Sequence, residues 1–140
     1  GHIIYHFADD DAAFVGDTLF SMGCGRLFEG TPGQMWESLS KLIDKLPDDT
    51  RIYCAHEYTQ SNARFAVTME PDNIELAARA QQVDRLREKG EPTIPSTMAL
   101  EKATNPFLRP DSAGIQATLG LPADDLVAVF AETRARKDNF

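Results

Sequence analysis

The two residues best suited to chemistry are a carboxylate and an imidazole, each just after a strand-like segment. Asp17 follows the apolar run 12–15 and a glycine, and His56 closely follows the run 51–54. Side chains at strand ends face solvent and clefts, where a carboxylate oxygen and a neutral imidazole nitrogen can bind a divalent metal. Alone, Asp17 is also typical of a turn residue and His56 of a helix cap. Their equivalent positions favour a shared metal site.

Two ligands do not complete such a site. Zinc is normally held by three or four protein ligands, and the sequence contains neither an H-x-H nor an H-E-x-x-H string. His2 and His6 are expected on one side of the first strand, because they are four residues apart. A hydrogen-bonding role is favoured over metal binding for both. We therefore expect this chain alone to bind zinc weakly.

Three cations lie close together near the end of the sequence, at Arg134, Arg136 and Lys137. Cations in the last turn of a helix interact favourably with the helix dipole, which would explain them without any ligand. The functional alternative is an anchor for a ligand carboxylate, for which arginine is well shaped. The residues themselves leave both readings open.

Composition restricts the classes of partner. The 140 residues include 22 acidic and 14 basic side chains, with a net charge of −8, whereas a duplex-binding protein normally has a basic face. We therefore expect no nucleic-acid partner. No apolar run approaches the roughly 20 residues of a membrane helix, so we also expect no membrane association.

Cysteine content and the start of the sequence suggest a cellular location. Cys24 and Cys54 are too few for a disulfide scaffold, and no secretory signal is visible. These features indicate reduced thiols in a cytoplasmic protein, and we expect neither thiol to take part in catalysis. Because the sequence opens without Met on a strand-like segment, we expect it to belong to a longer protein.

Around these residues the sequence predicts an α/β region. Segments 3–7, 12–15 and 51–54 are rich in apolar residues and are predicted as strands. A helix is predicted to begin at Thr31 and Pro32, with Thr as the N-cap and Pro in the first turn. Strand, loop, helix and strand suit a layered domain in which the helix packs on a sheet.

Beyond residue 57 the pattern changes, and no strand is predicted. Prolines interrupt a series of helical segments, which we place at 63–69, 74–88, 97–103 and 124–137. We therefore predict a domain boundary near residue 57, with an α/β part at 1–56 and a helical domain at 57–140.

Several strings resemble the C-terminal half of hydroxyacylglutathione hydrolases (glyoxalase II), members of the metallo-β-lactamase superfamily. In order, they are GHIIYHF, FVGDTLFSMGCGRLFEGT, RIYCAHEYT, GEPTIPST, NPFLR and RARKDNF. GDTLF is shared across the superfamily, whereas GCGR-x-FEGT and the trailing RKD are more specific to the glutathione thioesterases. The resemblance implies the C-terminal part of a metallo-β-lactamase-like αββα sandwich in residues 1–56, followed by a small all-helical glutathione-binding domain in residues 57–140.

The resemblance also implies a metal centre. Asp17 matches the aspartate that bridges two divalent metals, and His56 matches the last histidine ligand of the second metal. His2 matches the second histidine of an H-T-x-G-H string, which is not itself a ligand. The T-H-x-H-x-D-H motif and the first histidine of H-T-x-G-H are missing from this sequence. Zinc is the expected metal, with iron or manganese as alternatives.

A second group of residues matches positions that contact glutathione. Arg26 and the backbone around Phe28 match the glutathione-contacting loop, where many relatives have Lys and Tyr. Tyr58 matches a tyrosine that contacts the glutathione backbone. Arg134 and Lys137 match the basic pair that holds the glycine carboxylate of glutathione.

The function implied by the resemblance is hydrolysis of S-(2-hydroxyacyl)glutathione thioesters to glutathione and a 2-hydroxy acid such as D-lactate, a step of methylglyoxal detoxification. A hydroxide on the binuclear metal centre would attack the thioester. We expect this chain to be inactive without the missing N-terminal half. Two alternatives remain: a non-catalytic glutathione-binding fragment, or another superfamily hydrolase such as a lactonase. The GCGR and RKD strings disfavour the second.

Overall fold

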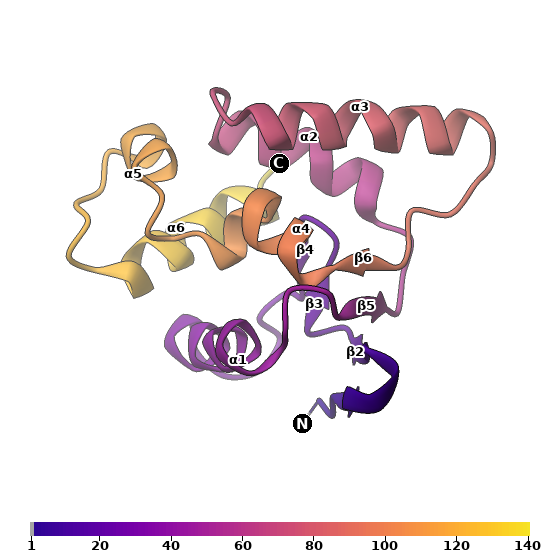
Figure 1. Ribbon diagram of the computed structural model, residues 1–140. Coiled ribbons are helices and arrows are strands. Elements are labelled where there is room, and N and C mark those ends of the chain that lie inside the picture. The colour runs from indigo at the N-terminus through magenta and orange to yellow at the C-terminus, as the bar shows by residue number, and fades with distance from the viewer. Residues whose placement is uncertain (1) are drawn as a thin grey trace.

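A four-stranded sheet forms one side of the molecule in the computed structural model, which describes residues 2–140 (Figure 1). The strand order is β1-β2-β5-β6, in which β2 and β5 are parallel and the two outer pairs are antiparallel. The strands are β1 (Tyr5–Phe7), β2 (Ala12–Gly16), β5 (Arg51–Cys54) and β6 (Ser96–Thr97). The predicted mixed α/β fold is confirmed.

Helix α1 (Pro32–Lys45) connects the two parallel strands, as a parallel pair requires. It begins where the sequence predicts, because a capping box closes its first turn. Thr31 Oγ1 accepts a hydrogen bond from Gln34 N at 3.2 Å, and Gln34 Oε1 accepts one from Thr31 N at 2.9 Å. Leu39 and Leu42 form the buried face of the helix.

The region after residue 57 is mainly helical. Its helices are α2 (Thr59–Met69), α3 (Ile74–Glu88), α4 (Met98–Thr104), α5 (Ala113–Leu119) and α6 (Leu126–Asp138), with the short 3-10 helix η2 (Pro106–Leu108) between α4 and α5. Another 3-10 helix, η1 (Ala8–Asp10), lies between β1 and β2. Helices α2, α3, α4 and α6 confirm the four predicted segments. Helix α5 was not predicted, although Ser112 caps its first turn and Gly120 ends it in the left-handed conformation.

Two predictions about strands are wrong. The region 57–140 is not all-helical, because β6 adds an edge strand to the sheet by pairing with β5. Two residues are too short to show an alternating pattern, so the sequence had no signal for this strand. The first strand begins at Tyr5 rather than at residue 3. His2 therefore lies before the strand and does not share a strand face with His6.

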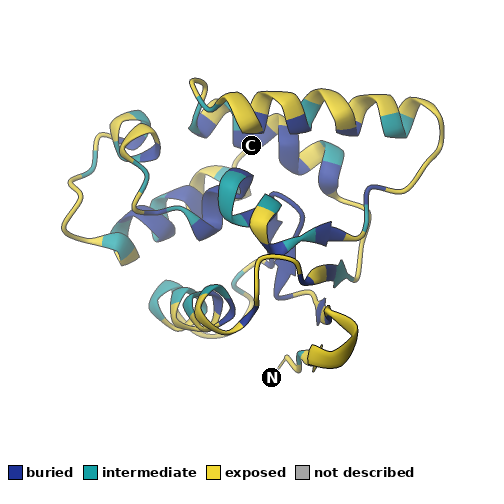
Figure 2. Ribbon diagram, in the orientation of Figure 1, coloured by how far each residue is buried: buried dark blue, intermediate teal, exposed yellow. Residues whose placement is uncertain are grey.

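One hydrophobic core joins the two parts of the chain (Figure 2). Ala13 and Val15 on β2 belong to the same buried cluster as Phe107 and Phe130, which come from η2 and α6. The rings of Phe107 and Phe130 pack edge to face at 5.9 Å. The core is thus continuous across residue 57, and the division into two domains stays a prediction. No helix within residues 2–140 is both long and apolar enough to cross a membrane.

A second, smaller hairpin lies against the helices. It consists of β3 (Leu19–Phe20) and β4 (Gly23–Cys24), joined by the two-residue turn Ser21-Met22. Met22 has a φ of 55°, a backbone conformation that is unfavourable for residues other than glycine, and its side chain is fully buried. A hairpin this short depends on its surroundings for stability.

Glu70, at the end of α2, is the centre of a polar network that ties α2 to the segment before α5. Its carboxylate accepts hydrogen bonds from Arg109 Nη2 at 2.8 Å, Ser112 Oγ at 2.9 Å and Asn73 Nδ2 at 3.2 Å. Burial opposes ionisation of Glu70, but these donors and the charge of Arg109 outweigh it and lower the carboxyl pKa. The network therefore stabilises the ionised form.

We expect Glu70→Gln to lower the free energy of unfolding at pH 7 by about 2–3 kcal/mol, because it removes a charged acceptor of several hydrogen bonds. A lowered folded-state pKa means that the stabilisation is present above the usual carboxyl pKa and is lost as the pH falls through the folded-state value. Urea unfolding from pH 7 to pH 3 should therefore show the wild-type and variant curves converging at acid pH. Glu75→Gln, an exposed carboxylate on α3, is the control. A gap that stays constant with pH would contradict the electrostatic explanation.

Candidate functional site

Asp17 and His56 meet at one edge of the sheet. They follow the carboxyl ends of β2 and β5, which are adjacent parallel strands, and Ala55 N donates a hydrogen bond to Gly16 O at 3.0 Å between them. His56 Nε2 lies 3.3 Å from Asp17 Oδ1, and both side chains are about half exposed, at 48% and 51%. The parallel pairing thus brings together the two residues that the sequence singled out.

The spacing of this pair suits a metal. Two ligand atoms each about 2.0–2.2 Å from one tetrahedral metal lie roughly 3.3–3.5 Å apart. The donor set, one carboxylate and one imidazole, is common for zinc, iron and manganese. However, no group of three or more His, Cys, Asp or Glu residues that could hold a metal occurs within residues 2–140. Asp17 and His56 therefore fit part of a metal site.

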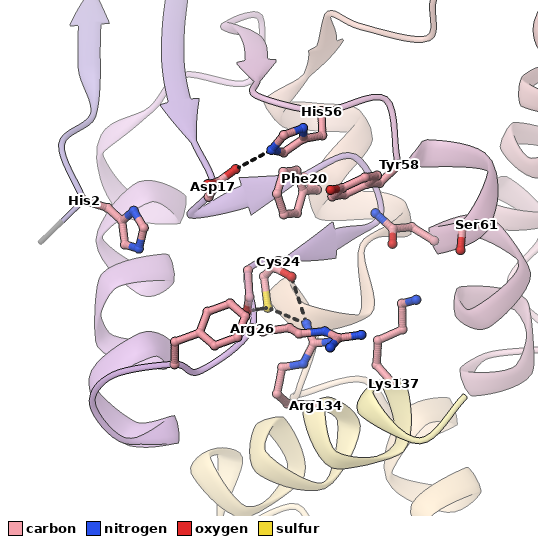
Figure 3. A pocket seen from close by; sticks show the side chains of 13 residues that line it. His2, Asp17, Phe20, Cys24, Arg26, His56, Tyr58, Ser61, Arg134 and Lys137 are labelled. Carbon is pink, nitrogen blue, oxygen red and sulfur yellow. Dashed lines mark hydrogen bonds and ion pairs between the residues drawn. The ribbon is translucent and has the colours of Figure 1, made fainter.

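Aromatic rings hold the His56 imidazole in place. The ring stacks on Tyr58 at a centroid distance of 4.8 Å and an interplanar angle of 16°. Phe20, from β3, packs edge-on against Tyr58 at 5.2 Å and lies 6.0 Å from the imidazole. These contacts restrict rotation of the imidazole and keep its Nε2 directed toward Asp17 (Figure 3).

Gly25 is required by the close approach of two backbone segments. Gly25 N donates a hydrogen bond to Thr18 O at 3.3 Å. A Cβ atom added at Gly25 would lie only 2.2 Å from Asp17 O, so the backbone beside Asp17 would have to move. The second glycine of the GCG string thus allows the loop to pass directly behind the carboxylate.

Arg134 lies at the other end of the site and is almost entirely engaged by the protein. Its Nη1 donates a hydrogen bond to Cys24 O at 2.8 Å, and its Nη2 lies 2.8 Å from Asp138 Oδ1. The guanidinium also lies 4.9 Å above the ring of Phe107. Arg134 is buried and ties α6 to the β3–β4 hairpin.

Lys137, one turn further along α6, is the more available cation. Its Nζ lies 5.8 Å from the centre of the Phe65 ring. Burial lowers the pKa of Lys137, and the positive charges of Arg134 and Arg26 lower it further, although Asp138 opposes them. Three cations therefore crowd one end of the site, which favours an anionic ligand.

These side chains surround one cleft of about 410 Å³ (Figure 3). The lining includes all the site residues predicted from the sequence, which are Asp17, Arg26, Phe28, His56, Tyr58, Arg134 and Lys137. His2 also lines the cleft, whereas His6 is not among the lining residues. In the close view, Asp17, His56 and Tyr58 lie at one end and the cations at the other.

Several lining residues were not predicted, namely Phe20, Cys24, Gly25, Ser61 and Asn62. Ser61 and Asn62 lie in the first turn of α2, directly after Tyr58, so their helical spacing from Tyr58 was a signal that could have found them. Phe20 had a weaker signal, its place in the GDTLF string three residues after Asp17.

The Cys24 thiol lines the cleft but is poorly suited to be a nucleophile. Burial raises its pKa to about 11, although Arg134 partly opposes this. A thiol must ionise to react, so one with a raised pKa is inert near neutral pH. Burial also raises the pKa of the Cys54 thiol. Both cysteines are free, as predicted.

The fold and the cleft define a class of protein: a mixed α/β chain that presents a carboxylate–imidazole pair at one end of a cleft and cations at the other. Residues 57–140 match the family model described as hydroxyacylglutathione hydrolase C-terminus. The chain belongs to the hydroxyacylglutathione hydrolase family.

Its relatives include proteins named hydroxyacylglutathione hydrolase from three bacteria. The identity is 61% with the protein of Maricaulis maris, 58% with that of Methylococcus capsulatus and 57% with that of Ruegeria pomeroyi. Each alignment covers 100% of this chain and 54% of the relative. The chain therefore spans about half the length of the curated relatives it matches.

We expect Gly25→Ala to displace Asp17, because the new Cβ would overlap its carbonyl oxygen. Overpacking of this kind typically costs about 1–3 kcal/mol. The imidazole resonances of His56 should shift in nuclear magnetic resonance (NMR) spectra, and the melting temperature should fall. Gly33→Ala is the matched control, since its Cβ would meet only ordinary contacts at 3.8 Å. A Gly25 variant as stable as the control, with unshifted His56 signals, would contradict this account.

Proposed function

We propose that this chain is the C-terminal part of a metal-dependent hydrolase of S-(2-hydroxyacyl)glutathione thioesters, which releases glutathione and a 2-hydroxy acid such as D-lactate. In this reaction water adds to the thioester carbonyl carbon, the C–S bond breaks, and glutathione leaves. The observation that carries the proposal is the division of the cleft, with Asp17 and His56 at one end and the cations at the other (Figure 3). The names of the relatives support the same substrate class.

The cationic end suits the glutathione part of the substrate. The glutathione part of the substrate carries a carboxylate at each end, and its cysteine sulfur, near the middle, bears the acyl group as a thioester. A site that holds a terminal carboxylate therefore also places the reactive bond. Lys137 and Arg26 are the cations best placed for this role, since Arg134 already contacts Cys24 O and Asp138. In this proposal Arg134 keeps α6 against the cleft and adds positive potential. Remote binding of this kind orients the reacting bond.

Asp17 and His56 would hold the metals, together with ligands from the rest of the family's chain. When bound, two divalent metals supply an activated water and polarise the thioester carbonyl. Zinc is the expected metal, and iron or manganese are alternatives. The residues of this chain support that chemistry by position: Tyr58 fixes the His56 ring, and Gly25 allows the loop to close behind Asp17.

Replacing Lys137 with Ala tests the substrate assignment in the longer protein. A charge-assisted contact to a carboxylate is worth roughly 1.5–3 kcal/mol, so kcat/KM for a glutathione thioester should fall about ten- to hundredfold. The loss should lie mainly in KM, because the contact is remote from the reacting bond. Replacing Asp17 or His56 should instead abolish turnover of every thioester.

Two controls make the test of Lys137 specific. A small thioester that lacks the glycine carboxylate should be hydrolysed almost equally by the wild type and the Lys137 variant. Arg136→Ala removes an exposed cation from the same turn of α6, outside the cleft lining, and should leave both substrates unaffected. Equal losses for both substrates in the Lys137 variant would refute the glutathione assignment.

We further propose that the sheet forms part of a metallo-β-lactamase-like αββα sandwich. Tyr5, Phe14 and Tyr53 are cross-strand neighbours and share one sheet face, on the side opposite Ala13 and Ile52, which are buried in the core. In the part of the chain that the structure describes, Tyr5 is 60% exposed and Phe14 is 47% exposed. Exposed aromatic patches of this kind mark surfaces that pack against another element. The remaining length of the family's chain is the proposed partner, and 1–56 and 57–140 remain the proposed domains.

This proposal predicts that Phe14→Asp destabilises the longer protein but barely affects the present chain. The substitution buries a charge only if a second layer covers the face. Thermal unfolding of both proteins should show a loss of several degrees in the longer one alone. Ile74→Asp, at an 84% exposed site on α3, should be neutral in both. Equal effects of the Phe14 change in the two proteins would argue against a covering sheet.

A further inference from the structure

The β3–β4 hairpin has a central place in the cleft but little stability of its own. Each strand has two residues, and the turn contains Met22 with φ of 55°. An isolated hairpin of this size is marginal at best, and a non-glycine residue at positive φ adds strain. The turn is nevertheless buried, so its polar groups need partners inside the protein.

Glu101, on α4, provides some of these partners. Its side chain is completely buried. Oε1 accepts a hydrogen bond from Met22 N at 2.8 Å, and Oε2 accepts one from Ser21 Oγ at 3.1 Å. Both donors belong to the turn, about 80 residues away along the chain. Burial raises the pKa of Glu101 above its usual value, and the hydrogen bond from Met22 N partly opposes this.

Asn105, from the NPFLR string, binds the two residues that flank the turn. Its Nδ2 donates hydrogen bonds to Phe20 O at 3.1 Å and Gly23 O at 3.0 Å, and lies 3.1 Å from Glu101 Oε1. Its Oδ1 accepts a hydrogen bond from Phe107 N at 2.9 Å, which fixes the orientation of the amide. Glu101 and Asn105 thus form one connected network around the turn, which we call the turn clamp.

The hairpin held by the turn clamp touches both ends of the cleft. Phe20, at the end of β3, packs against His56 and Tyr58. Cys24, at the end of β4, accepts the hydrogen bond from Arg134. A displacement of the turn would therefore change the wall beside the metal-ligand pair and the support of the cationic end together.

We propose that Glu101 and Asn105 are positioning residues, which set the spacing between the Asp17–His56 pair and the cations by clamping the β3–β4 turn from α4. This inference rests on the proposed function, in which a glutathione thioester must reach both ends of the cleft. The turn clamp touches none of the reacting atoms; it acts through Phe20 and Cys24. Fixing a site before the ligand binds reduces the ordering cost of binding.

The experiment uses the full 140-residue chain with reduced glutathione as the probe. Four variants are compared with the wild type: Glu101→Ala, Glu101→Gln, Ser21→Ala and Thr104→Ala. Thr104 is the matched control, because it is buried on α4 but donates only to Leu100 O of its own helix. Trp36, the only tryptophan, packs on Phe130 away from the turn and reports folding by fluorescence. NMR ring signals of Phe20, Tyr58 and His56 report the cleft wall.

We expect Glu101→Ala to shift these ring signals and to weaken glutathione binding about five- to tenfold at temperatures where Trp36 reports a folded protein. Glu101→Gln should restore both, because its amide can accept from Met22 N and bond to Ser21 Oγ. Ser21→Ala, which removes one hydrogen bond, should shift the same signals less. Thr104→Ala should lower the melting temperature without shifting them.

The proposal is overturned if Glu101→Ala or Ser21→Ala changes only the melting temperature, as the Thr104 control does. If Glu101→Ala does not fold, the milder Ser21 variant decides, because shifted ring signals support the clamp and unshifted ones refute it. If the wild-type chain does not bind glutathione, the proposed substrate class is in error. In that case the NMR ring signals alone test the turn clamp. Failure of the turn-clamp proposal and failure of the glutathione assignment are therefore distinguishable.

Discussion

The parallel pairing of β2 with β5 is the contact on which the cleft depends. It brings two chain segments separated by a loop and a helix to the same sheet edge, and it leaves Asp17 and His56 with their polar atoms 3.3 Å apart. Helix α1 makes this pairing achievable, because a parallel pair needs a long crossover connection. The hydrogen bond from Ala55 N to Gly16 O holds the strand ends together just behind the two side chains.

Electrostatics divides the cleft in a way that the overall charge does not suggest. The chain carries a net charge of −8, yet Arg26, Arg134 and Lys137 gather at one end of the cleft. Burying the charge of Arg134 is compensated, because a carboxylate, a carbonyl and an aromatic ring surround its guanidinium. Lys137 has fewer protein contacts than Arg134, the other α6 cation that lines the cleft, which makes Lys137 the better candidate for a ligand contact.

The helical region contributes more to the cleft than its cationic helix. It adds a strand to the sheet, shares the hydrophobic core with β2, and supplies the buried side chains that hold the β3–β4 turn. Two strings without obvious chemistry gain a physical role in this way. Ser96 and Thr97 of GEPTIPST form β6, and Asn105 of NPFLR binds the turn. The region after residue 57 therefore supports the sheet and the hairpin as well as lining the cleft.

The sequence by itself determined the features that depend on short-range signals. The start of α1 followed from Thr31 and Pro32, and the exposed ends of two strands identified Asp17 and His56, because capping and strand boundaries are local. Only the tertiary structure decided features whose partners are remote in sequence. The bond between Arg134 and Cys24 spans 110 residues, and the contact between Glu101 and Met22 spans 79. No local pattern marks a two-residue strand or a buried carboxylate, because each exists only through the segment it meets.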